Sequence, residues 1–396
     1  MTLSNEQFLD RLLAAARDVG ASDVHLKVGK PPILRIGGEL RTVKGGAPLE
    51  EAFLATFSAK LMNPRQAKIY GEKREVDLAF STADDIRYRV NIFQQRGNTG
   101  MVLRVIPPEV PPFETLNLPS VLMDLASKRR GLVLVTGVTG SGKSTTLAAM
   151  VEHVNKTRSC HILTVEDPIE YMFRDRKSVV NQRELGMDTT GFSPALRAAL
   201  RQDPDVILVG EMRDLETIEI ALTAAETGHL VLSTLHTTDA VETINRIISV
   251  FSPHQQNQIR VQLSAILVGI VSQRLAVRAD GKGMIPAVEI LVANKRVREL
   301  ILEPNRVKEI REVIAQSREP YGMISFDQSL TELVNSEKVT YEEALSCSTN
   351  AEDFALNFSG VKDGGSEDAA WVEHGQFREG QAPSDGLALD DKNELF

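Results

Sequence analysis

Four short apolar runs occur along the middle of the chain, and stretches with a helical pattern separate them. The runs are Leu132–Val135, Ile162–Val165, Val206–Val209 and Leu230–Leu235. Buried strands that alternate with helices are typical of a parallel sheet covered by helices on both faces. Each run ends in a polar or glycine-rich segment, and ligands of such sheets bind at the carboxyl ends of the strands. We therefore expect the chemistry of this chain at those four strand ends.

The first part of the chain, residues 1–106, has a different pattern. It opens with an amphipathic helical stretch and continues as short strands, with a turn at Gly37 and Gly38. Residues 86–93 alternate between polar and apolar side chains, which is the period of a strand with one buried face. Residues 101–106 are a second strand candidate. A small α+β domain is the prediction for this region.

A proline-rich segment marks the predicted domain boundary. Proline fixes φ and resists both helix and central-strand placement, so residues 107–119 are expected to form a stiff connector. Residues 120–359 then form the second domain, whose pattern is mostly helical from residue 253 onward. The tail, residues 360–396, is rich in Gly, Ser, Asp and Glu and is expected to be disordered.

The charge balance argues against direct binding of nucleic acid. The 396 residues carry a net charge of −9, and the acidic tail contributes the larger part of it. The nearly neutral body therefore lacks the basic surface that nucleic acid requires.

Cysteine usage and hydropathy indicate the compartment. The two cysteines, Cys160 and Cys347, have no metal-binding spacing and are typical of a reducing cytosol. The charged N-terminus is not a secretory signal, and no stretch approaches the roughly 18 unbroken apolar residues of a spanning helix. We expect a protein without a transmembrane segment, whose membrane association runs through a partner or through its surface.

A phosphate-binding loop follows the first apolar run. The segment Gly-Val-Thr-Gly-Ser-Gly-Lys-Ser at 137–144 matches the pattern G-x-x-x-x-G-K-[ST]. Its glycines let backbone amides turn toward phosphates, and the helix that follows presents its positive N-terminus. Lys143 is expected to reach the β- and γ-phosphate oxygens, and Ser144 to bind Mg²⁺. The predicted cofactors are thus ATP and Mg²⁺, and the predicted nucleotide contacts are Gly137, Thr139, Gly140, Ser141, Gly142, Lys143, Ser144 and Thr145.

Acidic residues end two of the other runs. Gly210 and Glu211 follow the third run, and many P-loop enzymes have a magnesium-binding aspartate where this chain has Gly210. Glu211 is then the acidic group expected to polarise the attacking water. Glu166 and Asp167 follow the second run. Glu166 is expected to hold the magnesium shell, directly or through water, or to share the role of base with Glu211, and Asp167 is expected to line the nucleotide site. Either cluster by itself also fits a solvated loop or a helix cap, but the neighbouring phosphate loop favours catalysis.

Two histidines flank the fourth run, His229 just before it and His236 just after it. A histidine at the active edge of the sheet would sense the γ-phosphate by hydrogen bonding and relay its loss to a subunit contact. A structural role, satisfied by neighbouring polar groups, is equally compatible with the pattern.

Together these segments resemble the secretion ATPase superfamily of type II secretion and type IV pilus systems, specifically its PilT-like branch. The stretch 137–145 is similar to the Walker A motif of that family, 163–170 to its Asp box, 201–217 to its Walker B motif and 227–238 to its His box. The similarity also includes the upstream segments 20–26, 87–91 and 102–107.

The resemblance implies the architecture and the activity. Its members are homo-hexameric rings of a PAS-like N-terminal α+β domain and a RecA-like P-loop ATPase domain, with a parallel sheet, a helical C-terminal part and ATP at the seam. The implied activity is ATP hydrolysis that powers type IV pilus retraction and twitching motility, in the cytoplasm at the periphery of the inner membrane. The implied partners are a pilus platform protein of that membrane and, as a further candidate, a paralogous pilus ATPase.

The resemblance also implies that basic residues of the N-terminal domain close over the nucleotide. Arg104, Arg89 and Arg96 are the candidates, because a guanidinium stabilises the charge that develops on the γ-phosphoryl group. Each of them also fits a surface arginine on a half-exposed strand.

Two features divide the assignment within the family. The two isolated cysteines cannot build the four-cysteine zinc module of extension-type relatives, and we expect no counterpart of their extra N-terminal domain, which favours the retraction type. However, the Ala-Ile-Arg-Asn-Leu-Ile-Arg-Glu helix of retraction proteins is altered here at Glu299 and Leu302, and the segments 322–330 and 339–345 look more like the accessory PilU branch. An accessory ATPase that depends on a paralogue, a nucleic-acid translocase and a regulatory ATP-binding subunit therefore stay as alternatives.

Overall fold

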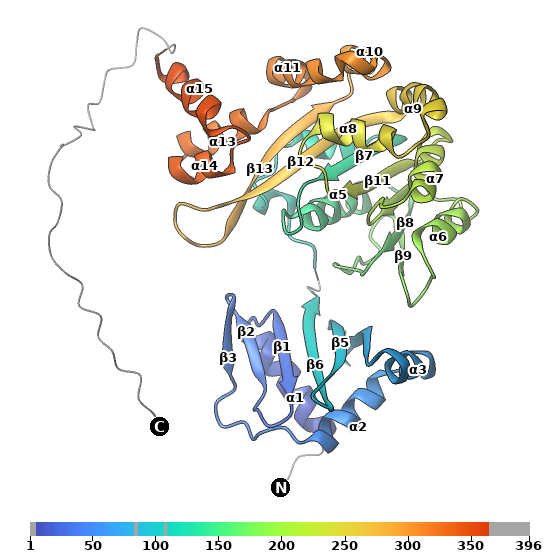
Figure 1. Ribbon diagram of the computed structural model, residues 1–396, viewed down its shortest axis with the longest axis vertical. Helices are drawn as coiled ribbons and strands as arrows, with labels where there is room; N and C mark the ends of the chain where they lie inside the picture. Colours follow the sequence, from blue (N-terminus) through green and yellow to red (C-terminus); the bar gives the residue numbers. More distant parts are fainter. Residues whose placement is uncertain (1–4, 83–85, 107–108, 364–396) are drawn as a thin grey trace, which may run out of the picture. The chain divides into compact units, whose positions relative to one another are not determined.

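The computed structural model describes residues 5–82, 86–106 and 109–363. The chain divides into two compact units, residues 1–351 and 352–396. The first unit contains two sheets, one in each of the regions that the sequence pattern distinguishes (Figure 1). In the second unit, the described residues belong to helix α15 (Ala351–Asp363), so the first residues of the predicted disordered tail are helical. The rest of that tail lies outside the described residues.

The N-terminal sheet has six antiparallel strands in the order β3-β2-β1-β6-β5-β4. Along β5 the predicted alternation is confirmed, since Tyr88, Val90 and Ile92 are fully buried and the residues between them are partly exposed. The predicted turn at Gly37 and Gly38 joins β2 to β3, with positive φ at both glycines. The strands are β1 (Asp23–Lys27), β2 (Ile33–Ile36), β3 (Glu39–Thr42), β4 (Glu75–Ser81), β5 (Arg87–Gln95) and β6 (Asn98–Ile106).

The buried face of this sheet forms a core with two helices. Apolar side chains of α1 (Asn5–Asp18) and α2 (Glu51–Leu61) pack on it. A third helix, α3 (Pro64–Lys73), leads into β4, and the side chain of the preceding residue, Asn63, caps its N-terminus. The predicted α+β fold of the first region is confirmed.

The second sheet has seven strands in the order β13-β12-β7-β11-β10-β8-β9. All neighbours are parallel except β12 and β13, which are antiparallel. The four predicted apolar strands are confirmed as the parallel core β7, β11, β10 and β8. The strands are β7 (Gly131–Thr136), β8 (His161–Glu166), β9 (Val179–Glu184), β10 (Val206–Val209), β11 (Leu230–Leu235), β12 (Leu267–Val277) and β13 (Met284–Val292).

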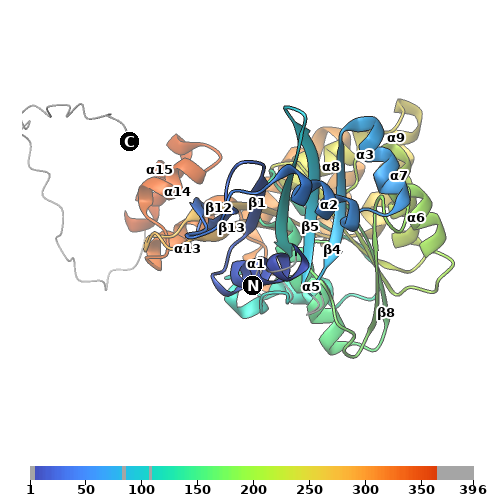
Figure 2. The same cartoon turned by 90° about the horizontal axis from the view of Figure 1, so that it is seen from below.

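Helices cover both faces of this sheet, which explains why its central strands are apolar on both sides. On one face α4 (Val121–Ala126) and α5 (Lys143–Thr157) pack against it, together with the 3₁₀ turn η1 (Phe113–Thr115) of the proline-rich connector. The helices on the other face are α6 (Phe192–Ala199), α7 (Leu215–Glu226), α8 (Ala240–Ser249), α9 (Pro253–Ile266), α10 (Lys295–Leu302) and α11 (Ile310–Gln316). Of these, α6, α7 and α9 lie side by side in both Figure 1 and Figure 2.

The expectation of a mostly helical stretch after residue 253 is wrong for residues 267–292. These residues form the β12–β13 hairpin, in which an 11-residue strand pairs with a 9-residue strand. Apolar runs do not separate a buried helix from a buried strand by periodicity alone, and here pairing with β7 decided the outcome. Beyond the hairpin the helical expectation is confirmed by α10, α11, η2 (Pro304–Glu309), α12 (Arg318–Tyr321), α13 (Phe326–Asn335) and α14 (Tyr341–Cys347).

Candidate nucleotide-hydrolysis site

The predicted phosphate loop connects β7 to the N-terminus of α5. Gly137 has φ +143° and lies so close to its neighbours that an added Cβ would be 2.4 Å from Gln273 O and 2.5 Å from Ser141 Oγ. Gly142 has φ +89°, and an added Cβ there would be 2.6 Å from Gln273 Nε2. Only glycine fits both the backbone conformation and the space at these positions. The loop is therefore closely packed against β12, with its backbone in the form needed to turn amides inward.

Lys143 is the first residue of α5 and is buried inside the loop. Its ammonium group donates to Gly137 O at 2.7 Å and to Val138 O at 2.9 Å. Burial lowers the pKa of Lys143, and the carboxylate of Glu211 acts in the opposite direction. The ammonium group of Lys143 is thus held within the loop itself. It lies opposite Glu211, which follows β10, and β11 separates β10 from β7 in the sheet.

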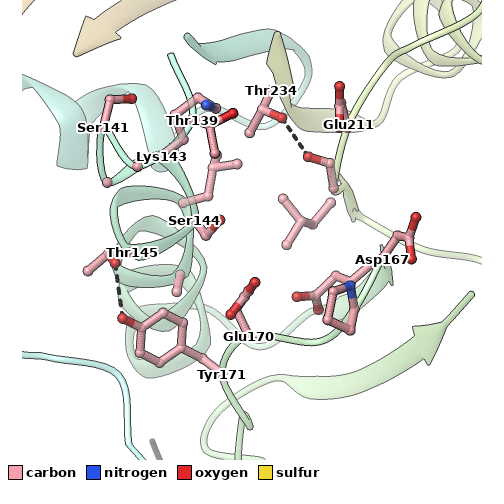
Figure 3. A pocket seen from close by; sticks show the side chains of 18 of the residues that line it. Thr139, Ser141, Lys143, Ser144, Thr145, Asp167, Glu170, Tyr171, Glu211 and Thr234 are labelled. Atoms are coloured by element: carbon pink, nitrogen blue, oxygen red, sulfur yellow. Dashed lines mark hydrogen bonds between the residues drawn. The ribbon is translucent and has the colours of Figure 1, made fainter. Parts of the chain in front are cut away.

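A cavity of about 760 Å³ opens in front of the loop. This volume is in the range of ordinary small-molecule sites. Figure 3 shows Lys143, Ser144 and Thr145 on the α5 side and Asp167, Glu170 and Glu211 across from them. Among the predicted site residues, those that line the cavity are Thr139, Gly140, Ser141, Gly142, Lys143, Ser144, Thr145, Glu166, Asp167, Glu211, His236 and Arg104.

Glu211 lies directly after β10 and is held between two basic side chains. Arg213 Nε donates to its Oε2 at 2.7 Å, and His236 Nε2 lies 3.0 Å from its Oε1. β10 and β11 are parallel neighbours, so their carboxyl ends bring Glu211 and His236 to the same edge of the sheet. The structure therefore brings together the predicted water-polarising acid and one predicted γ-phosphate sensor.

Gly210 is closely packed at the strand end where many P-loop enzymes have an aspartate. A Cβ at this position would be 3.2 Å from Val165 O and 3.3 Å from Glu166 Cα. A larger side chain would therefore push against the neighbouring strand end that carries Glu166. Glu166 and Glu211 are the acidic residues on either side of this close contact.

Glu166 ends β8 and is 8% exposed. Its Oε1 accepts from Thr164 Oγ1 at 2.7 Å and from Gln182 Nε2 at 3.2 Å. Burial raises the pKa of Glu166 to about 6, although the hydrogen bonds from Thr164, Gln182 and the backbone at Glu170 act in the opposite direction. A carboxyl group with this pKa, at the edge of a polar cavity, is suited to proton transfer near neutral pH.

The loop after Glu166 approaches the phosphate-binding helix. Asp167 and Glu170 are exposed in the cavity wall, and the hydroxyl groups of Tyr171 and Thr145 are 3.0 Å apart (Figure 3). Within the described residues no three His, Cys, Asp or Glu side chains gather closely enough to hold a metal ion by themselves. Any cation at this site therefore needs ligands from the nucleotide and from water in addition to the protein.

The structure does not bring the remaining predicted residues into the cavity. His229 lies at the opposite end of β11, where its Nδ1 is 2.8 Å from Ala224 O. Arg89 and Arg96 belong to the N-terminal sheet and its β5–β6 turn, and neither lines the cavity. Of the three arginines only Arg104 reaches the lining, and it also donates to Asp23 at 2.9 Å.

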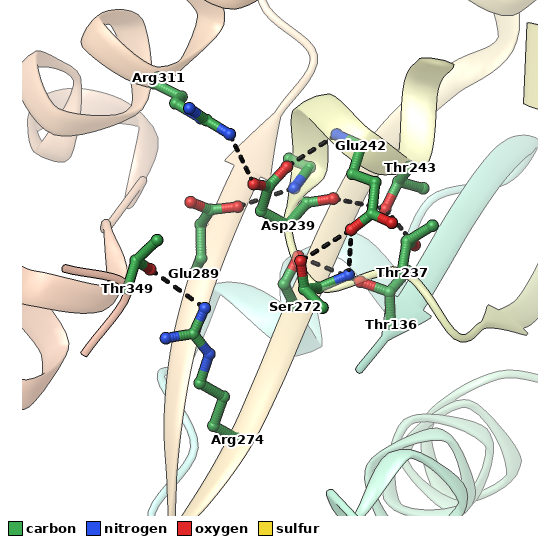
Figure 4. A network of polar contacts seen from close by, with 12 residues as sticks. Thr136, Thr237, Asp239, Glu242, Thr243, Ser272, Arg274, Glu289, Arg311 and Thr349 are labelled. Carbon is green, nitrogen blue, oxygen red and sulfur yellow. Dashed lines mark hydrogen bonds and ion pairs between the residues drawn. The ribbon is translucent and has the colours of Figure 1, made fainter. Parts of the chain in front are cut away.

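A second polar cluster lies where the β11–α8 loop meets β13 and α11, and sequence reasoning missed it (Figure 4). Glu289 of β13 accepts from the backbone amide of Ala240 at 2.8 Å, and Arg311 donates to Asp239 at 2.8 Å. Burial raises the pKa of Glu289 to about 7. The only signal in the sequence was a single acidic residue within an otherwise apolar strand.

Gln182 and Gln273 were also missed. Gln273 Oε1 accepts from Thr146 Oγ1 of α5 at 2.7 Å, and Gln182 contacts Glu166. Gln273 is a polar side chain within the largely apolar strand β12, and that feature could have singled it out. Gln182 lies among other polar residues of β9, and nothing in the sequence distinguishes it.

The comparisons with known proteins agree with this geometry. A family model described as type II/IV secretion system protein matches residues 4–349. The type IV pilus retraction ATPase PilT of Pseudomonas aeruginosa is 46% identical over 336 residues, which cover 85% of this chain and 96% of that protein. The type IV pilus ATPase PilU of the same organism is 40% identical over 347 residues, which cover 88% of this chain and 90% of that protein.

A solved structure gives the same result in three dimensions. The crystal structure of the pilus retraction motor PilT with bound ADP is similar to this chain with a TM-score of 0.81 and 44% identity, covering 87% of this chain and 97% of that one. Within the described residues, no helix has both the length and the apolar character needed to cross a bilayer. Since the family model and these relatives extend over most of its length, the chain belongs to the type II/IV secretion system protein family.

Proposed function

We propose that this protein is an ATP-hydrolysing motor subunit that powers the retraction of type IV pili. The observation that carries the proposal is a single cavity in which the phosphate loop with Lys143 faces Glu211 and Glu166. The likeness to PilT, including the structure of that motor with bound ADP, supports both ATP as the nucleotide and retraction as the work performed.

In this proposal each side chain has a distinct task. The loop amides and Lys143 bind the β- and γ-phosphates, and the helix N-terminus adds its positive dipole. Glu211 orients and polarises the attacking water, and its contact with His236 makes it responsive to what occupies the γ-phosphate position. Glu166, buried at the end of β8, either shares the role of base with Glu211 or holds the magnesium shell.

The residues present fit a magnesium ion. Mg²⁺ prefers oxygen ligands and is usually held by one or two protein groups together with phosphates and water. The hydroxyl of Ser144 and the carboxylate of Glu166, the latter directly or through water, are the groups that would hold it. Bound there, Mg²⁺ would neutralise the charge of the phosphates during transfer.

The motor works as a homo-hexamer in this proposal. Arg104 supplies positive charge from the N-terminal domain when that domain closes over a nucleotide at a subunit seam. Sequential hydrolysis moves the two domains as rigid bodies about the proline-rich connector and turns a platform protein of the inner membrane. The protein is thus placed in the cytoplasm, held at the membrane through the pilus machinery.

An accessory role, with a paralogous ATPase as the main motor, is the second candidate. It is favoured by helix α10, where the altered positions Glu299 and Leu302 are about half exposed, whereas Leu300 and Ile301 are fully buried. The two altered residues therefore change the exposed surface of α10, on which a partner would bind, and the buried residues that pack this helix on the fold are retained. The 40% identity with PilU is consistent with this reading.

Gene deletion tests the proposal. Cells that lose the gene should become hyperpiliated and lose twitching motility, because pili continue to be assembled but are not withdrawn. Loss of surface pili on deletion would mean an assembly function and would overturn the proposal. If twitching survives deletion of this gene but is lost when the paralogue alone is deleted, the accessory role is the correct one. In parallel, the purified oligomer should release phosphate from ATP in the presence of Mg²⁺.

A further inference from the structure

Gln182 lies on edge strand β9, directly opposite Thr164 of β8 in the parallel register. Its side-chain amide makes three contacts with the neighbouring strand end and the loop that follows it. Nε2 donates to Glu166 Oε1 at 3.2 Å and to Tyr171 O at 2.9 Å, and Oε1 accepts from the amide of Phe173 at 2.8 Å. Both amide hydrogens and the carbonyl oxygen of the side chain are therefore used.

These contacts add a side-chain link between two neighbouring parts of the site. One part is the carboxylate of Glu166, whose Oε1 also accepts from Thr164. The other is the loop 167–173, which approaches α5 through the contact between Tyr171 and Thr145 at 3.0 Å. A side chain that binds both fixes the carboxylate and the loop relative to the first turn of the phosphate-binding helix.

We propose that Gln182 is a positioning residue for ATP hydrolysis, which holds Glu166 and the 167–173 loop in the arrangement required for turnover. Gln182 does not line the cavity, so its side chain is not expected to contact the nucleotide. Its effect is transmitted through Glu166. A misplaced catalytic group costs rate even where substrate binding is unchanged, because chemistry depends on the orientation of groups already held in reach.

The strand itself supplies a control. Asn181 precedes Gln182 on β9 and therefore points to the opposite face of the sheet, where its Oδ1 is 2.8 Å from His161 Nε2. It is exposed, and its side chain contacts His161 rather than the loop or Glu166. Substitution of Asn181 tests the effect of altering an amide on this edge strand without touching the site.

The decisive variant is Gln182→Met, which keeps the length of the side chain and removes its hydrogen bonds. We expect kcat for ATP to fall about tenfold, with KM and the affinity for ADP changed by less than about twofold. Asn181→Met should keep the parental kcat. If Gln182 contributed only to stability, Gln182→Met would keep the parental kcat per folded molecule. Thermal unfolding and ADP binding are therefore measured on the same samples.

A double-mutant cycle identifies the route of the effect. In a Glu166→Gln background, Gln182→Met should lower the single-turnover rate by less than about twofold, because its target has already been altered. Thr164→Val, which removes the other hydrogen bond to Glu166 Oε1, should reproduce the loss of kcat and the same non-additivity. It also serves as the second test if Gln182→Met folds poorly.

The inference rests on the proposed ATP hydrolysis, and the two fail in different ways. If the parent protein releases no phosphate from ATP, the proposed function fails. If the parent is active and both Gln182→Met and Thr164→Val keep its kcat, or if their losses add fully to that of Glu166→Gln, the positioning role is overturned and the proposed function stands.

Discussion

Two buried glutamates of the same sheet, Glu166 and Glu289, differ in their surroundings: Glu166 borders a cavity, and Glu289 contacts the N-terminus of a helix. Both are about nine-tenths buried, and burial raises the pKa of both, to about 6 and about 7. Glu166 accepts from neutral side chains and borders a cavity. Glu289 accepts from the N-terminal amide of α8, and this hydrogen bond and the charges of Arg311 and Arg274 oppose the rise in its pKa, whereas the charge of Asp239 adds to it.

The comparison shows that burial and a raised pKa do not by themselves mark a catalytic group. A carboxyl group becomes a candidate for chemistry when space for a substrate lies beside it. Without that space the same group contributes to the packing of the fold, and its ionisation is a cost to stability. Substitutions around Glu166 should therefore change turnover, and substitutions around Glu289 should change stability.

The largest expected effect is that of Lys143→Ala. Removal of the ammonium group takes away the charge proposed to meet the β- and γ-phosphates, so ATP turnover should fall by at least about 100-fold. Phosphate release by the purified oligomer measures this change. Lys156→Ala, at the exposed end of the same helix, is the matched control and should keep the parental rate.

The next largest effect is expected for Glu211→Gln. The amide still occupies the place between Arg213 and His236 but no longer polarises water, so kcat should fall by roughly 100-fold or somewhat less. Binding of ATP, measured by titration, should be retained. A turnover close to that of the parent would remove Glu211 from the mechanism. Glu216→Gln, on an exposed ion pair with Arg197, should leave turnover unchanged.

On the other side of the comparison, Glu289→Gln should act on stability. The folded pKa of Glu289 is raised from 4.5 to about 7, so the folded state binds a proton that the unfolded state has released between these values. The stability of the parent therefore falls as pH rises from about 5 to about 7, and the neutral amide avoids this loss.

Thermal unfolding at pH 5 and pH 8 measures the difference. At pH 8 Glu289→Gln should be more stable than the parent by on the order of 2 kcal/mol, and at pH 5 the gain should shrink toward zero. The exposed Glu219→Gln is the control and should leave the pH dependence of the parent unchanged. A gain that is the same at both pH values would show that the charge of Glu289 is not its cause.

The smallest effect is expected for Arg311→Ala. Its ion pair with Asp239 is 2.8 Å long, but the Arg311 side chain is 60% exposed, and pairs of this kind contribute about 0–1 kcal/mol. Unfolding stability should fall within that range and less so at high salt, while ATP turnover remains parental. A marked loss of turnover would mean that the Asp239 cluster takes part in catalysis and would remove the distinction between the two regions.

Much of the site could be read from the sequence because its parts are local. The phosphate loop is one contiguous segment, and the four apolar runs placed Glu166, Glu211 and His236 at strand ends that the parallel sheet then aligned. His229 shows the limit of that reasoning. The buried strand β11 separates it from His236. The six residues of this strand span about 20 Å, so the two histidines lie at opposite ends of the strand.

The amino-acid sequence by itself determined the phosphate-binding chemistry, the alternation of strands and helices, and the family, because each depends on neighbours along the chain. Only the tertiary structure decided that residues 267–292 form a hairpin, that Gln182 reaches Glu166, and that Glu289 caps α8 away from the nucleotide cavity. The physical reason is that these features depend on contacts between segments far apart in the sequence, where pairing and packing override local pattern.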